Sequence, residues 1–383
     1  MRFSTFVFKN VLRRRTRSTL TATGIAVAVA AAVALVGLAD GFKTSLLDNY
    51  VKGNVTLIVS RCDTVNLLTG TMPEKTADEI AQLPEVKDVG AGLVDFTALE
   101  DLGNEMIGVQ GWPAGAYTFD DLKILKGESL SEKDHGKHNI IVGCKLADIK
   151  KVAVGSTLSM SDEKLHVVGV FQGASPTVDG MIILLLEDAQ HVLGKTGVIT
   201  GCTVRLKDPS DENIKSARAA IEGPVAAKFG LKGKISAMAP EQFVDNNNQA
   251  RFIKAMAWAV TVIALIICGI GVLNTMVMSV FERTREIGIL RAIGWQPSRV
   301  MRMILMESVL LSLVGGVLGT LMGLGMILAL SRVPLMNGAV HAAITPRIIG
   351  QGFAIAILVG LIGAAYPAFR GARLLPTEAI RHE

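Results

Sequence analysis

The sequence predicts a membrane protein with four transmembrane α-helices and one large α+β extracytoplasmic domain between the first and second helices. Of the 383 residues 50% are hydrophobic, and the mean hydropathy is +0.43. The apolar residues are concentrated in four uncharged runs, each of at least the roughly 20 residues that cross a bilayer as a helix. Charge is divided as well: residues 40–250 carry 21 Lys and Arg against 29 Asp and Glu, whereas the rest of the chain carries 18 against 5. Because basic residues collect in cytoplasmic segments, the acidic segment is predicted to lie outside.

The N-terminal segment, residues 1–17, mixes basic and apolar side chains and predicts an amphipathic helix on the cytoplasmic face of the membrane. Residues 18–39 then form an uncharged run of 22 residues. The apolar core of a signal peptide is shorter, about 7–15 residues. We therefore predict an uncleaved first transmembrane helix over residues 18–39, which enters from the cytoplasm.

Residues 40–250 have mixed charges, frequent Gly and Pro and no long apolar run, which indicates a folded domain. Strands are predicted at 55–59, 94–99, 139–142, 157–160, 165–171 and 203–206, and helices at 73–83, 187–193 and 211–229. The part from about 105 to 200 is the richest in strands and suggests a subdomain. Cys62, Cys144 and Cys202 are an odd number without metal-ligand spacing, and so at most one disulfide is expected here.

The C-terminal part of the chain holds the other three uncharged runs. We predict transmembrane helices over residues 255–280, 303–331 and 348–369, a short outer loop over 332–347 and a basic cytoplasmic tail over 370–383. Gly315, Gly319 and Gly323 recur every four residues in the third helix. Small residues at this spacing let two helices approach closely in a membrane. These glycines are therefore candidates for helix packing or for a dimer contact.

The segment between the second and third helices, residues 281–302, is predicted to be a cytoplasmic hairpin with a short charged helix from Glu282 to Gly294. Ile287, Leu290 and Ile293 recur every three residues and give this helix one apolar edge. The positive-inside rule explains its arginines, but not the interleaved glutamates or the apolar edge. We therefore expect the edge to dock into a groove of a partner protein.

The residue patterns of several chemistries are absent from the sequence. There is no His-Glu-x-x-His motif and no pair of carboxylates within a predicted span, so no metal, cofactor or catalytic residue is expected. Gly194-Lys195-Thr196 resembles the end of a phosphate-binding loop, but Ala189 stands where that motif needs glycine. The basic residues flank membrane spans, which explains them without nucleic acid. If ATP drives this protein, another polypeptide is expected to hydrolyse it.

Three motifs together resemble the FtsX-like permease family, which includes the macrolide-exporter (MacB) and lipoprotein-release types. Residues 282–294 are similar to the ERxREIGxLRAxG signature of the family, and residues 307–319 to the segment that follows it. Residues 367–381 are similar to its C-terminal PAxRAAxLxPxEALR motif, with Gly371 where alanine is usual. The resemblance runs from the N-terminal basic helix to the last residues.

The resemblance implies a homodimeric ABC transporter permease in a bacterial inner membrane, with both termini in the cytoplasm. Two separate ATPase subunits would bind ATP and Mg, and their closure would move the hairpin helix, the spans and the extracytoplasmic domains. The implied cargo is hydrophobic or amphipathic, and a periplasmic adaptor or an extracytoplasmic lipoprotein is a further implied partner. The residues that the resemblance assigns to ATPase coupling are Glu282, Arg283, Arg285, Glu286, Ile287, Leu290, Arg291, Ile293 and Gly294.

A different branch of the family transports nothing and instead transmits a signal across the membrane to a cell-envelope hydrolase. The middle domain, about 210 residues, favours the transporter, because the corresponding domain of the signalling branch tends to be smaller. The signal transmitter remains the alternative reading of the sequence.

Overall fold

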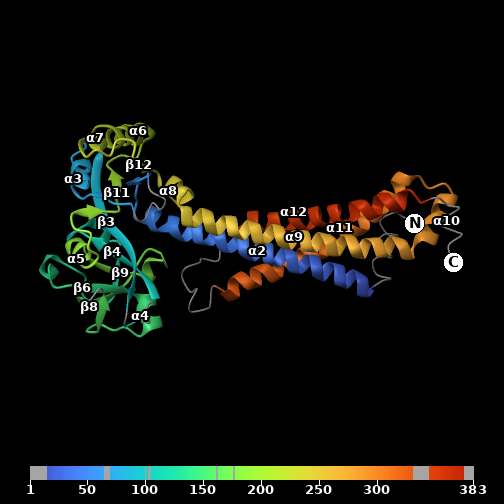
Figure 1. The fold of residues 1–383 in the computed structure, drawn as a ribbon, viewed down its shortest axis with the longest axis horizontal. Helices are drawn as coiled ribbons and strands as arrows, with labels where there is room; N and C mark the ends of the chain where they lie inside the picture. Colours follow the sequence, from blue (N-terminus) through green and yellow to red (C-terminus); the bar gives the residue numbers. More distant parts are fainter. Residues whose placement is uncertain are drawn as a thin grey trace. The chain divides into compact units, whose positions relative to one another are not determined.

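The computed structural model describes residues 15–63, 70–99, 101, 105–160, 163–175, 177–330 and 345–374 (Figure 1). The chain divides into two compact units, a helical one and an α/β one, Gly41–Phe252. Three predicted features lie outside the described residues: most of the N-terminal amphipathic helix, most of the outer loop over 332–347, and the tail beyond residue 374 with the end of its motif.

The helical unit contains four helices that are long and apolar enough to cross a membrane. They are α2 (Arg15–Lys52), α9 (Asn248–Glu282), α11 (Pro297–Leu330) and α12 (Pro346–Ala372). This confirms the predicted fold class of four spans with a large domain between the first and the second. The helices are longer than the uncharged segments from which they were predicted. A charged residue limits the part of a helix that can lie in the membrane, but it does not end the helix. In α2 the extra turns carry Leu46, Leu47 and Tyr50, which pack beside Phe243 in the α/β unit.

The four membrane helices share one core. Ile25 of α2, Val272 of α9, Leu311 of α11 and Ala356 of α12 belong to the same cluster of buried apolar side chains. Small residues bring α11 and α12 together: the Ser308 hydroxyl of α11 donates to the Gly360 carbonyl oxygen of α12 at 2.7 Å. Close packing of this kind depends on backbone approach rather than on large side chains.

The α/β unit is built on a ten-stranded mixed sheet with the strand order β12-β1-β11-β3-β4-β9-β6-β8-β5, and β7 pairs with β8. The strands of this sheet are β1 (Leu57–Arg61), β3 (Val86–Leu99), β4 (Glu105–Trp112), β5 (Lys123–Gly127), β6 (Asn139–Gly143), β7 (Thr157–Met160), β8 (Glu163–Gln172), β9 (Ile182–Leu185), β11 (Gly201–Leu206) and β12 (Ile235–Met238). Two further short strands, β2 (Met72–Pro73) and β10 (Val198–Ile199), pair with each other.

The long strand β3 changes partner along its length. Its first half pairs with β11 and its second half, from Leu93 onward, pairs with β4. Strands β4 to β9 come from the stretch that we expected to form a subdomain, but β3 joins them to the rest of the sheet. We predicted only residues 94–99 of this strand, because the glycines and charges before them are untypical of a strand.

Short helices cover the sheet: α3 (Lys75–Ala81), α4 (Cys144–Lys150), α5 (Leu186–Val192), α6 (Asp211–Ala220), α7 (Ala226–Lys228) and α8 (Pro240–Asn246). The single helix predicted over 211–229 is α6 and α7 with a π-helical turn between them, Ile221–Val225. Pro224 lies in that turn, and a proline cannot donate the hydrogen bond that a regular helix needs there. All four cysteines are free thiols.

Candidate functional site

The charged hairpin contains the helix α10 (Thr284–Ala292) between α9 and α11. The prediction of one helix from Glu282 to Gly294 is wrong at both ends. Glu282 is the last residue of α9, and Arg283, at φ −107° and ψ 11°, breaks the helix. Gly294 lies beyond the end of α10 with φ +98°. Its amide donates to the Arg291 carbonyl oxygen at 3.1 Å, and the Trp295 amide donates to that of Leu290 at 3.0 Å.

This pair of hydrogen bonds ends α10 in a tight reversal that requires a left-handed residue after the helix. Glycine takes that conformation without a steric cost, which explains the glycine of the motif. Pro297 then starts α11 at a position where its missing N–H costs nothing. The sequence therefore fixes where α10 stops and where the chain re-enters the membrane.

One side of α10 packs into the helical unit itself. Ile287 is 1% exposed and belongs to a buried cluster with Val280 of α9, Ile304 of α11 and Ala368 of α12. Gly288 beside it is buried as well. Ile287, which we expected on an exposed edge, therefore packs within its own chain. The break at Arg283 sets the rotation of α10, and this rotation turns Ile287 inward.

A buried ion pair ties the start of α10 to the third span. The Nη1 atom of Arg283 donates to Oε2 of Glu307 at 2.9 Å, and both side chains are buried. Each charge compensates the other, and either would be strongly unfavourable alone in this surrounding. Arg283, which we expected at the ATPase interface, instead holds the hairpin against α11.

We expect Arg283→Met to destabilise the protein by about 3–5 kcal/mol, because the buried carboxylate of Glu307 would lose the guanidinium that compensates its charge. Thermal unfolding of the purified protein in detergent measures this. Arg285→Met is the matched control, since Arg285 is exposed on the next turn and its loss should change the melting temperature little. The double variant Arg283→Met/Glu307→Leu should recover most of the loss. Equal melting temperatures of the two single variants would contradict the role of the ion pair.

The other side of α10 is exposed and partly apolar. Ile289 is 49% and Ile293 70% exposed, and the exposed Arg285 and Glu286 flank them. The two isoleucines are four residues apart and therefore lie on one face of a helix. Leu290 is only half-buried and lies between the two sides. From the sequence we missed Ile289, because the repeat of three residues pointed to Ile287, Leu290 and Ile293. The spacing of four residues between Ile289 and Ile293 identifies the exposed face.

The remaining polar residues of the hairpin bond within the chain. Oε2 of Glu282 accepts from Nη1 of Arg17 at 3.0 Å, which links the end of α9 to the start of α2. Nη1 of Arg291 donates to the Trp295 carbonyl oxygen at 2.9 Å. Of the nine residues predicted to couple to an ATPase, four are thus exposed together on α10 or just after it: Arg285, Glu286, Ile293 and Gly294.

The three glycines of α11 contact α2 of the same chain. A Cβ atom added to Gly315, Gly319 or Gly323 would lie 2.8, 2.5 or 2.9 Å from the carbonyl oxygen of Ala22, Ala26 or Ala30, respectively. Both series advance by four residues, so the two helix backbones touch over three successive turns. Of the two predicted uses, helix packing is the one that these glycines serve in this chain.

The residues that the structure describes contain no group of three His, Cys, Asp or Glu side chains that could hold a metal ion. In the segment that resembles a phosphate-binding loop, the lysine is already ion-paired: Nζ of Lys195 lies 2.8 Å from Oδ2 of Asp95. The hairpin itself presents arginine, glutamate and isoleucine side chains on a short helix. Such a surface suits recognition of a protein, not bond-breaking chemistry.

The sequence and the fold have known relatives. The family described as "FtsX-like permease C-terminal" matches residues 258–376, and the "MacB-like periplasmic core domain" matches residues 18–223. An ABC transporter permease of Methanocaldococcus jannaschii is 27% identical over 99% of this chain and 97% of its own length. The macrolide export ATP-binding/permease protein MacB of Bdellovibrio bacteriovorus is 25% identical over 98% of this chain, which spans 61% of that relative.

Among solved structures, the periplasmic region of MacB from Actinobacillus actinomycetemcomitans is similar to 53% of this chain over 99% of its own length, with 15% identity and a TM-score of 0.41. The assignment to a family rests on the two family matches. The second match alone spans more than half of the chain, and together the two matches overlap all the described membrane helices. The chain is therefore a membrane protein that belongs to the FtsX-like, MacB-type family of ABC transporter permeases.

Proposed function

We propose that this chain is the permease subunit of an ABC exporter whose ATPase is a separate polypeptide. The observation that carries the proposal is the exposed face of α10, where Ile289 and Ile293 stand outward beside Arg285 and Glu286. A nine-residue helix that exposes Ile289, with Ile293 exposed directly after its end, is suited to a groove in a partner, since a buried isoleucine and a buried ion pair fix its position. ATP and Mg²⁺ would bind to that partner and not to this chain.

The proposed complex contains two copies of this chain and two ATPase subunits. Exposed apolar side chains on α9 support a second copy, because they need lipid or another helix to cover them: Ile263, Ile266, Ile267 and Ile270. The complex is proposed to lie in the inner membrane of a bacterium with both termini of the chain in the cytoplasm. The basic residues outside the α/β domain support this orientation.

ATP-driven closure of the ATPases is proposed to move α10 and, through it, the spans. The Arg283–Glu307 pair would carry the motion to α11, and the cluster around Ile287 would carry it to α9 and α12. Two of the membrane helices, α2 and α9, continue into the sequence of the extracytoplasmic domain without a break. A motion of the spans therefore has a direct covalent path to that domain.

The proposed cargo is a hydrophobic or amphipathic molecule, and a periplasmic adaptor or lipoprotein is proposed as a further partner. The relative from Bdellovibrio bacteriovorus is named for macrolide export, which supports export over signalling to a hydrolase. The exposed side chains of the membrane helices are largely apolar, which supports a motion transmitted by the spans over an aqueous pore through them.

Purification of the tagged full chain from its own membranes in mild detergent tests the proposal. We expect an ATPase polypeptide with nucleotide-binding motifs to co-purify at one copy per permease, and vanadate-sensitive ATP hydrolysis in the complex. Reconstitution into proteoliposomes should then give release of a bound amphipathic dye only with ATP. A native complex that contains a cell-envelope hydrolase and moves no cargo would favour the signal transmitter, and a chain without any ATPase would overturn the proposal.

A further inference from the structure

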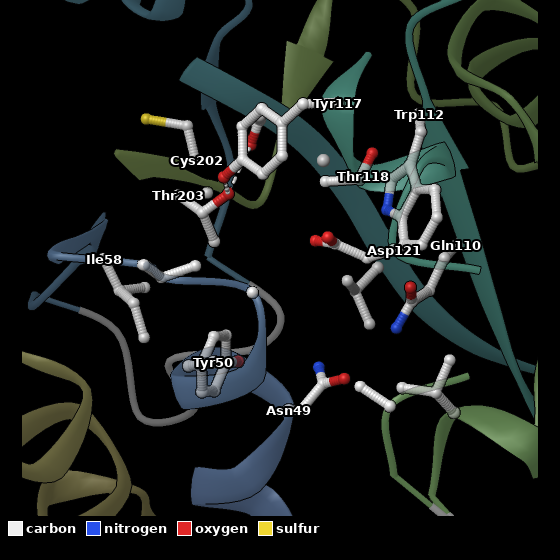
Figure 2. A pocket seen from close by; sticks show the side chains of 18 of the residues that line it. Asn49, Tyr50, Ile58, Gln110, Trp112, Tyr117, Thr118, Asp121, Cys202 and Thr203 are labelled. Atoms are coloured by element: carbon white, nitrogen blue, oxygen red, sulfur yellow. Dashed lines mark hydrogen bonds between the residues drawn. The ribbon is translucent and has the colours of Figure 1, made fainter. Parts of the chain in front are cut away.

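The extracytoplasmic unit contains a cavity of about 150 Å³ within a wider hollow of about 950 Å³ that is continuous with solvent (Figure 2). Its walls come from the end of α2, from β1, β3, β4 and β11, from the short 3₁₀ helix η2 (Tyr117–Phe119) and from α8. Every lining residue belongs to the unit Gly41–Phe252. A dry cavity of roughly 150 Å³ is large enough to hold a benzene ring.

Glycine leaves space in this part of the sheet, and aromatic rings keep it open. Gly92 of β3 lies opposite a glycine of β11, and both line the cavity. Tyr50 and Phe243 meet edge to face with ring centroids 5.8 Å apart, and Trp112 meets Phe119 in the same way at 5.3 Å. Rings that pack against one another cannot collapse into the gap. The cavity is therefore preformed for an apolar group of ring size.

Two hydroxyl groups in the wall have no hydrogen-bond partner among the described residues. They are the Oγ of Ser60, a residue that is 2% exposed on β1, and the Oγ1 of Thr118. Both oxygen atoms have almost no exposed surface, so they lie behind the wall and a ligand in the cavity reaches them only if the wall shifts. The side-chain amides of Asn49 and Gln110 lie around the same space and add donors and acceptors (Figure 2).

The lining carries one charged side chain at neutral pH, the carboxylate of Asp121. Burial raises the pKa of the Cys202 thiol to about 12 and also raises the pKa of Tyr117, so both groups stay neutral. Oδ2 of Asp121 accepts from Arg205 at 2.9 Å, whereas no described residue donates to Oδ1. No Lys, Arg or His side chain lines the cavity. The guanidinium of Arg205 lies just behind this wall, 3.7 Å from the centroid of the Tyr117 ring, and compensates much of the charge of Asp121. A positive group is therefore favoured locally, at Oδ1 of Asp121.

The geometry points to a binding site for a small amphipathic amine in the extracytoplasmic domain. Its ring-sized apolar part would lie between Tyr50 and Trp112, and its ammonium group would meet the free oxygen of Asp121. Polar substituents would bond to the side-chain amides of Asn49 and Gln110. The inference does not depend on the proposed export activity, because binding is measured on the permease without ATP or ATPase.

Three probes that share a phenyl ring and a short chain test the site on the full chain in nanodiscs: 2-phenylethylamine, 2-phenylethanol and 3-phenylpropanoate. Ligand-observed NMR gives their dissociation constants, and the same nanodiscs without protein correct for partition into lipid. The amine should bind most tightly, the alcohol about tenfold more weakly because a charge-assisted hydrogen bond is lost, and the carboxylate not measurably. No binding of the amine at 10 mM (roughly −3 kcal/mol) would overturn the inference.

Two variants place binding in this cavity. Gly92→Val should weaken the amine and the alcohol by more than tenfold, since a Cβ there fits beside Trp112 at 3.8 Å and the added methyl groups occupy the space. Gly223→Val, at a glycine with no atom within 4 Å of its Cβ and outside the lining, is the control. Asp121→Asn should lower the amine's affinity to that of the alcohol and leave the alcohol unchanged, and Asp120→Asn should change neither.

Each contrary result is decisive. Equal binding of the amine and the carboxylate would remove the charge argument. Unchanged binding in Gly92→Val, with an unchanged melting temperature, would place the probes elsewhere. An unchanged affinity of the amine in Asp121→Asn would show that Asp121 makes no contact with the ammonium group.

Discussion

Aspartate at Ile289 and Ile293 is expected to abolish binding of the proposed ATPase partner while the permease stays folded. Ile289 is exposed on α10 and Ile293 directly after its end, so a carboxylate at either position is solvated in the free protein. In the docked complex the same carboxylates would be buried without a partner. Each would then cost about 3 kcal/mol of binding free energy. Because 1.4 kcal/mol is a factor of ten, the double variant should bind its ATPase more than a hundredfold more weakly. Co-purification and stimulated ATP hydrolysis measure the effect.

Ile287→Asp on the same helix is the contrast. That side chain is enclosed by α9, α11 and α12, so the variant should lower the melting temperature and the yield of protein, whereas the Ile289 and Ile293 variants should not. Leu290→Asp, at a half-buried position, should show part of both effects. If the Ile289/Ile293 double variant still binds its ATPase and supports full activity, α10 is only a loop that obeys the positive-inside rule.

Gly319→Leu is expected to disrupt the membrane bundle. A Cβ on Gly319 would lie 2.5 Å from the carbonyl oxygen of Ala26 and 2.8 Å from the Cβ of Val29, and neither backbone can yield locally. The variant must push α2 and α11 apart, which would also open the contacts of Gly315 and Gly323. We expect a loss of at least about 3 kcal/mol, at the upper end for overpacked sites. Thermal unfolding in detergent and the yield of folded protein measure it.

Gly325→Leu is the matched control, because it lies on the same helix and a Cβ there has no atom within 4 Å. It should change the melting temperature little. The failure of Gly319→Leu should appear in the monomer as well as in any dimer, since its contact is with α2 of the same chain. Similar behaviour of the two variants would mean that the glycine series does not carry the packing.

The sequence predicted the four membrane helices and the large domain between the first two, because uncharged runs report directly on a solvent that excludes charge. It could not show which helix the glycines of α11 contact. Their spacing of four residues defines one face of α11, but it does not identify the helix that packs against this face. A signal was present in residues 18–39, where Ala22, Ala26 and Ala30 advance by the same four residues. The end of α2 was missed because the charges after residue 39 stop the crossing, while apolar side chains beyond them continue the helix.

The candidate site was predicted in composition but not in orientation. The Glu, Arg and Ile content of the hairpin was read correctly, yet a break of one residue at Arg283 decides which isoleucines point outward. The buried ion pair joins Arg283 to Glu307, which is 24 residues later in the sequence, and no local sequence pattern predicts it. The cavity of the extracytoplasmic domain was not foreseen at all, because its walls come from segments almost 200 residues apart.

Strand β3 gives the extracytoplasmic domain a place to flex. Its pairing with β11 ends at Gly92 and its pairing with β4 begins at Leu93, on the opposite edge. A bend between these two residues would break no hydrogen bond of either ladder. It would break those of Thr200, whose amide and hydroxyl donate to the Gly92 carbonyl oxygen and whose Oγ1 accepts from the Val94 amide. Rotation of one half of the sheet against the other is thus restrained by Thr200, together with the Tyr117–Thr203 hydrogen bond and the Arg205–Asp121 ion pair. The exchange rate of the Val94 amide would report on it.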